Sequence, residues 1–337
     1  MSFDVYLRQI QTGINLSRAD AKAFLGQIID NESLPDSSIA EVLRVLTKKS
    51  LVADEICGFV DAMRLRMVRL PYTGQAIDTC GTGGDKTGTF NISTATAILL
   101  AAGDVAVAKH GNRAATSKCG SADVLEALRI PIDQAPAAAA QALATQKFVF
   151  LFAPMYHPSL KRLSMVRKQL GFPTVFNLLG PLLNPADVKR QVIGTFSLAN
   201  AKLLAEVASM GGYEHAMVLT SDDGLDEASL SAPVRVFEVR KAIVSELVLR
   251  AEDYGLTPAP VSALRGGDAT QNAKLITTAL TPAKTLSAHQ EIIIFNAALG
   301  FYVAGKTESI EAGVIKASQV LASGQALTKL QELSSHR

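Results

Sequence analysis

Residues 78–126 constrain the fold of this chain more than any other segment, because turns rich in glycine and polar residues alternate there with short apolar runs. A glycine-rich turn at 81–85 directly follows a short strand-like run. The sequence Asn-Ile-Ser-Thr at 91–94 then opens an Ala/Leu-rich helical run. A second strand-like run leads into Lys-His-Gly-Asn-Arg at 109–113. Strand, turn and helix in this order predict an α/β fold built on a parallel sheet.

The same three segments have the properties of anion-binding sites. Glycines let backbone N–H groups approach an anion and tolerate positive φ. Polar residues at a helix start cap its free N–H groups, and that helix end attracts negative charge. Lys109 and Arg113 add formal positive charge beside them. Together the segments predict a ligand with several phosphates, although the Walker and dinucleotide glycine spacings are absent and a glycine-rich turn alone is also typical of an ordinary turn.

The rest of the chain predicts an α/β protein with two domains. Residues 1–72 contain amphipathic helical segments and no strand-like alternation, and Pro71 ends them, so we expect a small all-α domain. Residues 73–337 predict a larger α/β domain with a mainly parallel central sheet flanked by helices. The expected strands are 75–79, 104–108, 148–152, 190–196, 215–220, 233–239 and 243–249. The expected helices include 121–129, 135–145, 199–211, 268–280, 287–303 and 308–323.

Composition narrows the class of protein. Of the 337 residues, 48% are hydrophobic and 19% charged, as in a soluble globular enzyme. The net charge of +2 argues against general nucleic-acid binding, which needs a clustered basic face. The longest apolar run, 292–305, contains Asn296 and is too short to span a bilayer. The N-terminus has no apolar signal core, so we expect a cytoplasmic protein. The three cysteines of the chain lack metal-ligand spacing.

Three further features each allow two interpretations from the residues alone. Asp226-Glu227 offers the hard oxygen ligands that magnesium prefers, or is a solvated acidic loop. Arg167 has the planar fork that suits a carboxylate, or is an exposed residue of a basic helix. His110 is a candidate general base, or a packed histidine held by hydrogen bonds.

A resemblance connects these features. The motifs GTGGD, TFNIST, KHGNRA and GSADVLEAL, in this order and spacing, resemble those of the anthranilate phosphoribosyltransferases. The match continues through 167–186, DGLDE at 223–227 and GGDATQNA at 266–273, and so covers nearly the whole chain. It implies transfer of the phosphoribosyl group of phosphoribosyl diphosphate (PRPP) to the amine of anthranilate in tryptophan biosynthesis, with Mg²⁺ and a homodimer. It also implies that residues 155–186 cross back onto the helical domain, with the ligand cleft between the domains.

The resemblance further implies site residues. Catalytic roles fall on Arg167, Asn112 and Lys109, anthranilate binding on Gly81, Asn112 and Arg167, and the metal on Ser93, Asp226 and Glu227. PRPP binding falls on Gly81, Gly84, Asp85, Thr89, Asn91, Ile92, Ser93, Thr94, Lys109, His110, Gly111, Asn112, Arg113, Ala114, Ala115, Thr116, Ser117 and Ser121.

The chain also departs from the family pattern, and alternatives remain. Thr116 and Cys119 stand where serines are common. Arg129 stands where glycine is common, at a helix end that favours positive φ. The alternatives are a pyrimidine-nucleoside phosphorylase-like enzyme, which would lack the pairing of FNLLGPLLNP with GTGGD and TFNIST, and a non-catalytic nucleic-acid-binding relative, against which the intact GTGGD and DGLDE motifs speak.

Overall fold

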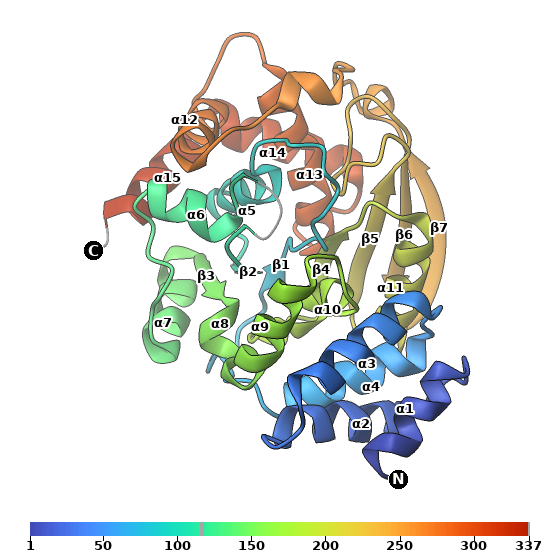
Figure 1. Cartoon of the computed structure of the whole chain (residues 1–337). Coiled ribbons are helices and arrows are strands. Elements are labelled where there is room, and N and C mark those ends of the chain that lie inside the picture. The colour runs from blue at the N-terminus through green and yellow to red at the C-terminus, as the bar shows by residue number, and fades with distance from the viewer. Residues whose placement is uncertain (115–117, 336–337) are drawn as a thin grey trace.

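The N-terminal part of the chain folds as a small helical domain. The computed structural model describes residues 1–114 and 118–335 (Figure 1). Its first helices are α1 (Phe3–Gln11), α2 (Arg18–Asp30), α3 (Asp36–Lys48) and α4 (Ala53–Arg64). Ser17 caps α2 by accepting a hydrogen bond from the backbone N–H of Asp20. Between the helices, the Lys49 ammonium and the Glu55 carboxylate form a buried ion pair of 2.8 Å, so this domain has polar as well as apolar internal contacts.

A seven-stranded sheet forms the centre of the larger domain, in the order β3-β2-β1-β4-β5-β6-β7. The pairings among β1 to β5 are parallel, and β6 and β7 add an antiparallel edge. The predicted mainly parallel sheet is therefore confirmed. The strands are β1 (Ile77–Asp78), β2 (Val107–Gly111), β3 (Phe148–Phe152), β4 (Arg190–Gly194), β5 (His215–Ser221), β6 (Val234–Arg240) and β7 (Ile243–Leu249).

Helices precede, connect and cover these strands (Figure 1). The α-helices are α5 (Ile92–Ala102), α6 (Ser121–Ala127), α7 (Pro136–Gln146), α8 (Ala153–Tyr156), α9 (Lys161–Leu170), α10 (Phe176–Leu179), α11 (Leu198–Met210), α12 (Ala269–Ala279), α13 (Ala288–Val303), α14 (Ile310–Ala322) and α15 (Gln325–Ser335). Short 3₁₀ turns are η1 (Pro158–Leu160), η2 (Gly180–Leu183), η3 (Ala251–Tyr254) and η4 (Val261–Leu264).

The strand predicted at 104–108 lies three residues further along, at 107–111. The reason is the end of α5, where Asp104 adopts a left-handed φ of +64°. The backbone N–H of Val105 then bonds back to the carbonyl of Leu100, which delays the strand. The exposed Arg129 has a left-handed φ of +61° just after α6, which confirms the expected positive φ at this helix end.

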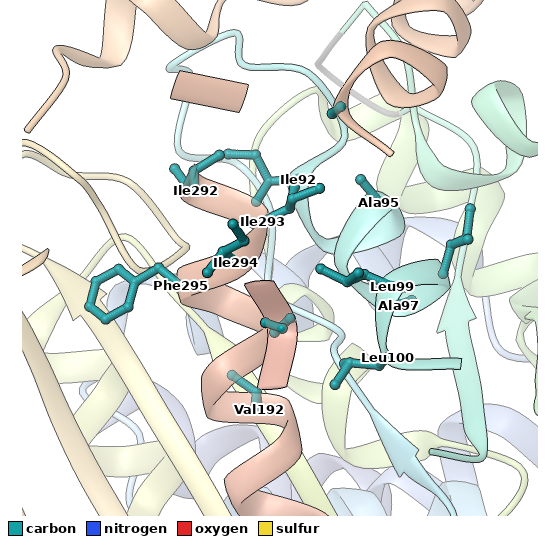
Figure 2. Close-up of a cluster of buried hydrophobic side chains, with 14 of the residues drawn as sticks. Ile92, Ala95, Ala97, Leu99, Leu100, Val192, Ile292, Ile293, Ile294 and Phe295 are labelled. Atoms are coloured by element: carbon teal, nitrogen blue, oxygen red, sulfur yellow. The ribbon is translucent and has the colours of Figure 1, made fainter. Parts of the chain in front are cut away.

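Alternate strand residues face two separate cores, as the two-residue period of a strand requires. On β4 and β5, Val192 and Met217 face the core that contains α5 and α13, and Figure 2 shows the isoleucines of α13 beside side chains of α5. Their neighbours Ile193 and Val218 face a second core, which contains α11 and the helices of the N-terminal domain. The central strands are thus covered on both faces, which explains their apolar sequences.

Residues 161–183 leave the sheet and pack against the helical domain. Leu163 and Val166 of α9, with Phe176 and Leu179 of α10, belong to the same buried cluster as the apolar side chains of α2, α3 and α4. The guanidinium of Arg162 forms an ion pair of 2.7 Å with Asp36 at the start of α3. In Figure 1, α9 and α10 accordingly lie beside α3 and α4.

Candidate active site

The candidate site lies where the order of the parallel strands reverses direction along the sheet, between β1 and β4. Ligands of open α/β sheets bind outside the carboxyl ends of the strands at such a point. The turn 81–85 follows β1, segment 109–113 ends β2, and the acidic motif at 226–227 follows β5. The glycine-rich turn, segment 109–113 and the acidic motif, which is far from both in sequence, therefore meet at the carboxyl end of the sheet.

The glycine-rich turn is packed tightly against the acidic motif. Gly83 has a φ of +62°, the left-handed conformation that glycine adopts without strain. The backbone N–H of Thr82 donates a 2.8 Å hydrogen bond to the carbonyl of Gly194, at the end of β4. A Cβ atom at Gly194 would lie 1.6 Å from the backbone oxygen of Asp226, so only glycine lets these segments approach. Gly194 was not among the predicted site residues.

The start of α5 differs in one respect from the expectation. Asn91 occupies the N-cap position, but its side chain caps no N–H group of the helix. Its amide instead donates to the carbonyl of Cys119 (3.2 Å) and accepts from the amide of Asn272 (2.8 Å). The backbone N–H of Ser93 donates to the Glu227 carboxylate at 3.1 Å, so a carboxylate lies at the positive end of the helix.

Lys109 carries a buried positive charge at the centre of this cluster. The residue is 1% exposed, and its Nζ donates to the Ser93 hydroxyl at 3.1 Å and to the Thr79 carbonyl at 3.2 Å. The charge opposes the rise in the pKa of the carboxyl groups of Asp78 and Glu227. A buried ammonium surrounded by oxygen atoms is suited to an anionic ligand that reaches the same edge.

Negative charge on the acidic motif is energetically costly in this environment. Burial, followed by the neighbouring carboxylate of Asp85, raises the pKa of Asp226. Burial, followed by Asp226, raises the pKa of Glu227. Carboxylates that are crowded and desolvated favour protonation unless a cation joins them.

The donor set fits a hard divalent cation. Asp226, Glu227 and the Ser93 hydroxyl offer oxygen atoms, which Mg²⁺ prefers. Across residues 1–114 and 118–335, no cluster of three or more His, Cys, Asp or Glu side chains is arranged to hold a metal ion. This set of few protein ligands is compatible with Mg²⁺, which usually keeps several waters and binds substrate phosphates.

The loop after β2 is held by acidic residues of α6. The Arg113 guanidinium forms ion pairs with Glu126 and with Asp123 (3.1 Å), and lies over the Phe152 ring. The Asp123 carboxylate also accepts from the backbone N–H groups of Ala114 and Gly120. The charge that we expected beside a phosphate is thus neutralised by carboxylates here.

The remaining predicted PRPP-binding residues have varied surroundings. Gly84 has a φ of +86° and Gly111 ends β2. Thr89 pairs with Arg265 in an isolated bridge, and Ser121 begins α6. Ile92 and Thr94 are buried in the first turn of α5. The predicted residues Ala115, Thr116 and Ser117 lie outside the described part of the chain.

Arg167 lies on α9, the helix that packs against the helical domain. Its guanidinium is over the Phe176 ring at 5.1 Å and donates a long hydrogen bond of 3.4 Å to the amide oxygen of Asn177. Within residues 1–114 and 118–335 these are its only polar and ring contacts and no carboxylate lies within ion-pair distance, and burial lowers the pKa of Arg167. No hydrogen bond joins it to Asn112 in that part of the chain, where the Asn112 side chain accepts from the backbone N–H of Arg113.

His110 is packed and electrically neutral. Its Nδ1 lies 3.2 Å from the carbonyl of Gly180, so Nδ1 carries the proton. Burial, followed by the nearby His157, lowers the pKa of His110 to about 3, and burial lowers the pKa of His157 to about 4. Such a ring is a weak base at neutral pH, which favours the packed-residue interpretation over general-base catalysis.

Asp78 is a site-supporting residue that the sequence reasoning missed. It is fully buried, and burial raises its pKa to about 6. Its carboxylate accepts from the backbone N–H groups of Thr79 (2.7 Å) and His110 (3.3 Å) and from the Asn184 amide (2.8 Å). The available signal was a lone carboxyl at the end of an apolar strand, directly before the glycine-rich motif.

The cysteines near the site have no features of a reactive thiol. Burial raises the pKa of the Cys119 thiol to about 11 and also raises the pKa of Cys80. The thiolate is the nucleophilic form of cysteine, so these environments favour packing over covalent chemistry.

Fold and site together define a two-domain glycosyl transferase. The family model described as "Glycosyl transferase family, a/b domain" matches residues 73–327. The model described as "Glycosyl transferase family, helical bundle domain" matches residues 5–67. Among the helices of the described residues, none has both the length and the apolar character that crossing a bilayer requires.

Individual relatives specify the family more closely. Anthranilate phosphoribosyltransferase of Geobacillus kaustophilus is 43% identical, covering 97% of this chain and 96% of the relative. The enzyme of that name from Chlorobium chlorochromatii is 40% identical, covering 97% of this chain and 94% of the relative. The chain belongs to the anthranilate phosphoribosyltransferase family.

Solved structures agree with this assignment. Anthranilate phosphoribosyltransferase from Thermus thermophilus superposes with a TM-score of 0.91 at 37% identity, covering 98% of each chain. The Saccharomyces cerevisiae enzyme, solved in complex with PRPP and Mg, gives a TM-score of 0.88 at 25% identity, covering 98% of this chain and 96% of that chain. The predicted family is confirmed, and the nucleoside phosphorylase and nucleic-acid-binding alternatives are not favoured.

Proposed function

We propose that this enzyme transfers the 5-phosphoribosyl group of PRPP to the amine of anthranilate, giving N-(5-phosphoribosyl)anthranilate and diphosphate. One observation carries the proposal. A buried ammonium, Lys109, and a helix start meet two crowded carboxylates, Asp226 and Glu227, at the switch point of the sheet. That combination suits a ligand with several phosphates accompanied by a cation.

On the donor side, the chain stabilises charge that develops on the leaving diphosphate. Breaking the C1–O bond gives the ribose oxocarbenium character and leaves a highly charged anion. Backbone N–H groups of the turn 81–85, the start of α5 and the Lys109 ammonium provide preorganised donors for that anion. We assign PRPP binding to the full set of residues predicted from the family motifs. Within it, Arg113 acts through its ion pairs, which hold the loop that follows β2.

We propose Mg²⁺ as the cation, held by Asp226, Glu227 and the Ser93 hydroxyl. The crowded carboxylates support this assignment, because groups whose pKa is raised by burial and mutual repulsion gain from the charge of a nearby cation. When bound, the ion neutralises charge on the diphosphate.

On the acceptor side, we assign the carboxylate of anthranilate to Arg167, with Asn112 and Gly81 beside the ring. A guanidinium fork donates two parallel hydrogen bonds to a carboxylate, and Arg167 has no acidic partner among the described residues. The aromatic amine of anthranilate is weakly basic and needs little deprotonation before it attacks C1. Catalysis can therefore depend on positioning, without a general base such as His110.

The direct test is turnover with defined substrates. Purified enzyme is mixed with PRPP and anthranilate, with and without Mg²⁺, while anthranilate loss is followed by fluorescence and product by mass. We expect product of the summed mass less diphosphate, dependent on Mg²⁺. Phosphorolysis of pyrimidine nucleosides without any use of anthranilate would contradict the proposal.

We also propose a homodimer formed through the helical domain. Met1, Val5 and Leu65 expose 63%, 41% and 67% of their surface there, which is apolar area that a second copy of the chain would cover. Sedimentation of the parent enzyme should show a dimer, and Leu65→Glu should shift it toward monomer. Ile243→Glu changes a similarly exposed residue of β7 and should leave the dimer intact. A parent enzyme that is only monomeric at micromolar concentration would contradict this.

We propose the domain boundaries that the sequence predicts. Residues 1–72 and roughly 155–186 form one domain, and the remainder of 73–337 forms the catalytic domain. The packing of α9 against α3 and of α10 against α4 supports the joining of this segment to the helical domain, and the same buried cluster continues into α11 and the central strands. A cytoplasmic location stays a prediction.

A further inference from the structure

The turn η2 has an unusual concentration of side-chain hydrogen bonds. Each of its four carbonyl groups accepts a bond from a side chain that lies outside the turn. The pairs are His110 Nδ1 with Gly180 (3.2 Å), Gln191 Nε2 with Pro181 (2.8 Å), Arg64 Nη2 with Leu182 (3.1 Å) and His157 Nε2 with Leu183 (3.1 Å). The carbonyl groups at the end of a helical turn have no partner within it, so these donors fix where the turn lies.

The donors come from both domains. Arg64 belongs to α4 of the helical domain, whereas Gln191 belongs to β4 at the centre of the sheet. Gln191 is fully buried, and the Tyr213 hydroxyl donates to its amide oxygen at 3.0 Å. Its register partner on β1 is Asp78, which binds the Asn184 amide directly after the turn. Gln191 and Asp78, which are adjacent in the sheet, thus bind η2 and the residue that directly follows it.

The turn is also joined to the surroundings of Arg167. Helix α10 runs directly into η2, and its first residue, Phe176, lies under the Arg167 guanidinium. The next residue, Asn177, accepts the hydrogen bond from Arg167 and one from the backbone N–H of Thr174 (3.0 Å). A displacement of η2 would therefore move the support of Arg167 relative to the sheet.

We propose that Gln191, oriented by Tyr213, is a positioning residue. It sets the distance between Arg167, which holds the acceptor, and the phosphate-binding groups at the turn 81–85 and Lys109. This rests on the proposed function, in which Arg167 holds the acceptor. Gln191 touches neither substrate, because it is fully buried beneath the turn. Its loss leaves the Pro181 carbonyl buried without a donor, so the turn shifts toward other partners.

A matched pair of variants separates positioning from stability. Gln191→Met removes the 2.8 Å bond from a buried glutamine amide to a backbone carbonyl. Gln290→Met, in the first turn of α13, removes a bond of the same kind and length to the Thr281 carbonyl. Each variant also removes the acceptor of a second bond, from the Tyr213 hydroxyl to Gln191 and from the Ser287 backbone N–H to Gln290, both of 3.0 Å. Both variants should therefore lower the Tm, because each leaves a carbonyl without its donor and a donor without its acceptor. Tyr213→Phe is a milder change that keeps the Gln191 amide and frees it to rotate.

Steady-state titration of each substrate against the full-length variants gives the result. We expect Gln191→Met to raise the KM for anthranilate about tenfold, with the KM for PRPP within about twofold of the parent. Tyr213→Phe should produce the same split to a smaller extent, and it decides the matter if Gln191→Met does not fold. Gln290→Met should leave both KM values at the parental level.

Two results would overturn the inference. One is an unchanged KM for anthranilate in Gln191→Met and Tyr213→Phe while their Tm falls as in Gln290→Met, which would make the network structural only. The other is an equal rise in both KM values, which would indicate general disorder of the sheet edge. A parent enzyme that makes no product from anthranilate contradicts the proposed function as well, so the two failures are distinguishable.

Discussion

Replacing Arg167 by methionine should stabilise the protein and impair its use of anthranilate. The guanidinium is partly buried, lacks a carboxylate partner among the described residues, and has its pKa lowered by burial. Methionine keeps an apolar stem over the Phe176 ring and removes the charge. Replacing a desolvated, unpaired cation by an apolar side chain is neutral or stabilising, so we expect the free energy of unfolding to rise by about 0.5–1 kcal/mol.

The effect on the acceptor has the opposite sign. A charge-assisted hydrogen bond contributes about 1.5–3 kcal/mol, which corresponds to about one to two decades in apparent affinity. Solvent in the cleft should move the result toward the lower end of that range. We therefore expect the KM for anthranilate to rise by about tenfold or more, while the KM for PRPP stays near the parental value. Arg167→Lys should restore little of the affinity for anthranilate, because a point charge cannot reproduce a two-pronged contact.

Thermal unfolding and titration of both substrates test the two effects together. Lys168→Met is the matched control, because it removes a positive charge from the adjacent, exposed position of the same helix. We expect that variant to change neither stability nor KM. An Arg167→Met enzyme with parental kcat and parental KM for anthranilate would refute the reasoning and make Arg167 an ordinary residue of a basic helix.

Three further predictions concern the turn, the acidic motif and the buried histidines. Gly83→Val places a branched side chain at a φ of +62°, so we expect at least about 1–2 kcal/mol of strain and weaker PRPP binding. A variant that folds and binds PRPP as tightly as the parent would contradict the assignment of the turn. Asp226→Asn with Glu227→Gln keeps volume and removes two charges, so the protein should fold while Mg²⁺-supported turnover collapses; unchanged turnover across a Mg²⁺ titration would indicate a solvated loop. His110 and His157 are neutral in the fold with their pKa lowered to about 3 and about 4, so the unfolded state binds more protons than the fold below about pH 6.5. The contribution of each histidine should be intact above about pH 6.5 and fall by about 2 kcal/mol by about pH 5, whereas the raised pKa values of Asp78, Asp226 and Glu227 act in the opposite direction over this range. Urea unfolding of the parent and of His157→Gln at both pH values isolates one histidine, and a stability difference between the two proteins that does not change with pH would disprove the burial of His157 as a neutral group.

The sequence predicted the layers of this fold because its periodicities are strong. The run Phe148–Phe152 is apolar throughout, as expected of a strand covered on both faces, and it became β3 with the expected bounds. Helix α13 begins one residue from its expected start, because Ser287 and Gln290 form a capping box. The first and last helices, α1 and α15, were not predicted.

Much of the site depends on contacts between residues that are distant in sequence. Asp78 and Asn184 are 106 positions apart, and they meet only because the chain returns to the sheet after residues 161–183 have packed against the helical domain. The role of Asn91 could not be foreseen either, because an asparagine before a helix normally caps that helix. Here the side-chain amide of Asn272 in α12 donates to the amide oxygen of Asn91 instead. Local pattern identifies such residues as polar and well placed, but their partners follow from the topology.

The packing of α5 has a consequence for how the enzyme is made on the ribosome. This helix presents its first turn to the candidate site, yet its sides are packed by α13 and α15, which are synthesised long after it. Domains tend to fold in the order in which they emerge, and partly folded chains expose apolar surface meanwhile. Helix α5 therefore lacks its packing partners, and the glycine-rich turn before it lacks a fixed position, until residues 288–335 have emerged. Nascent chains that stall before that point should depend on chaperones.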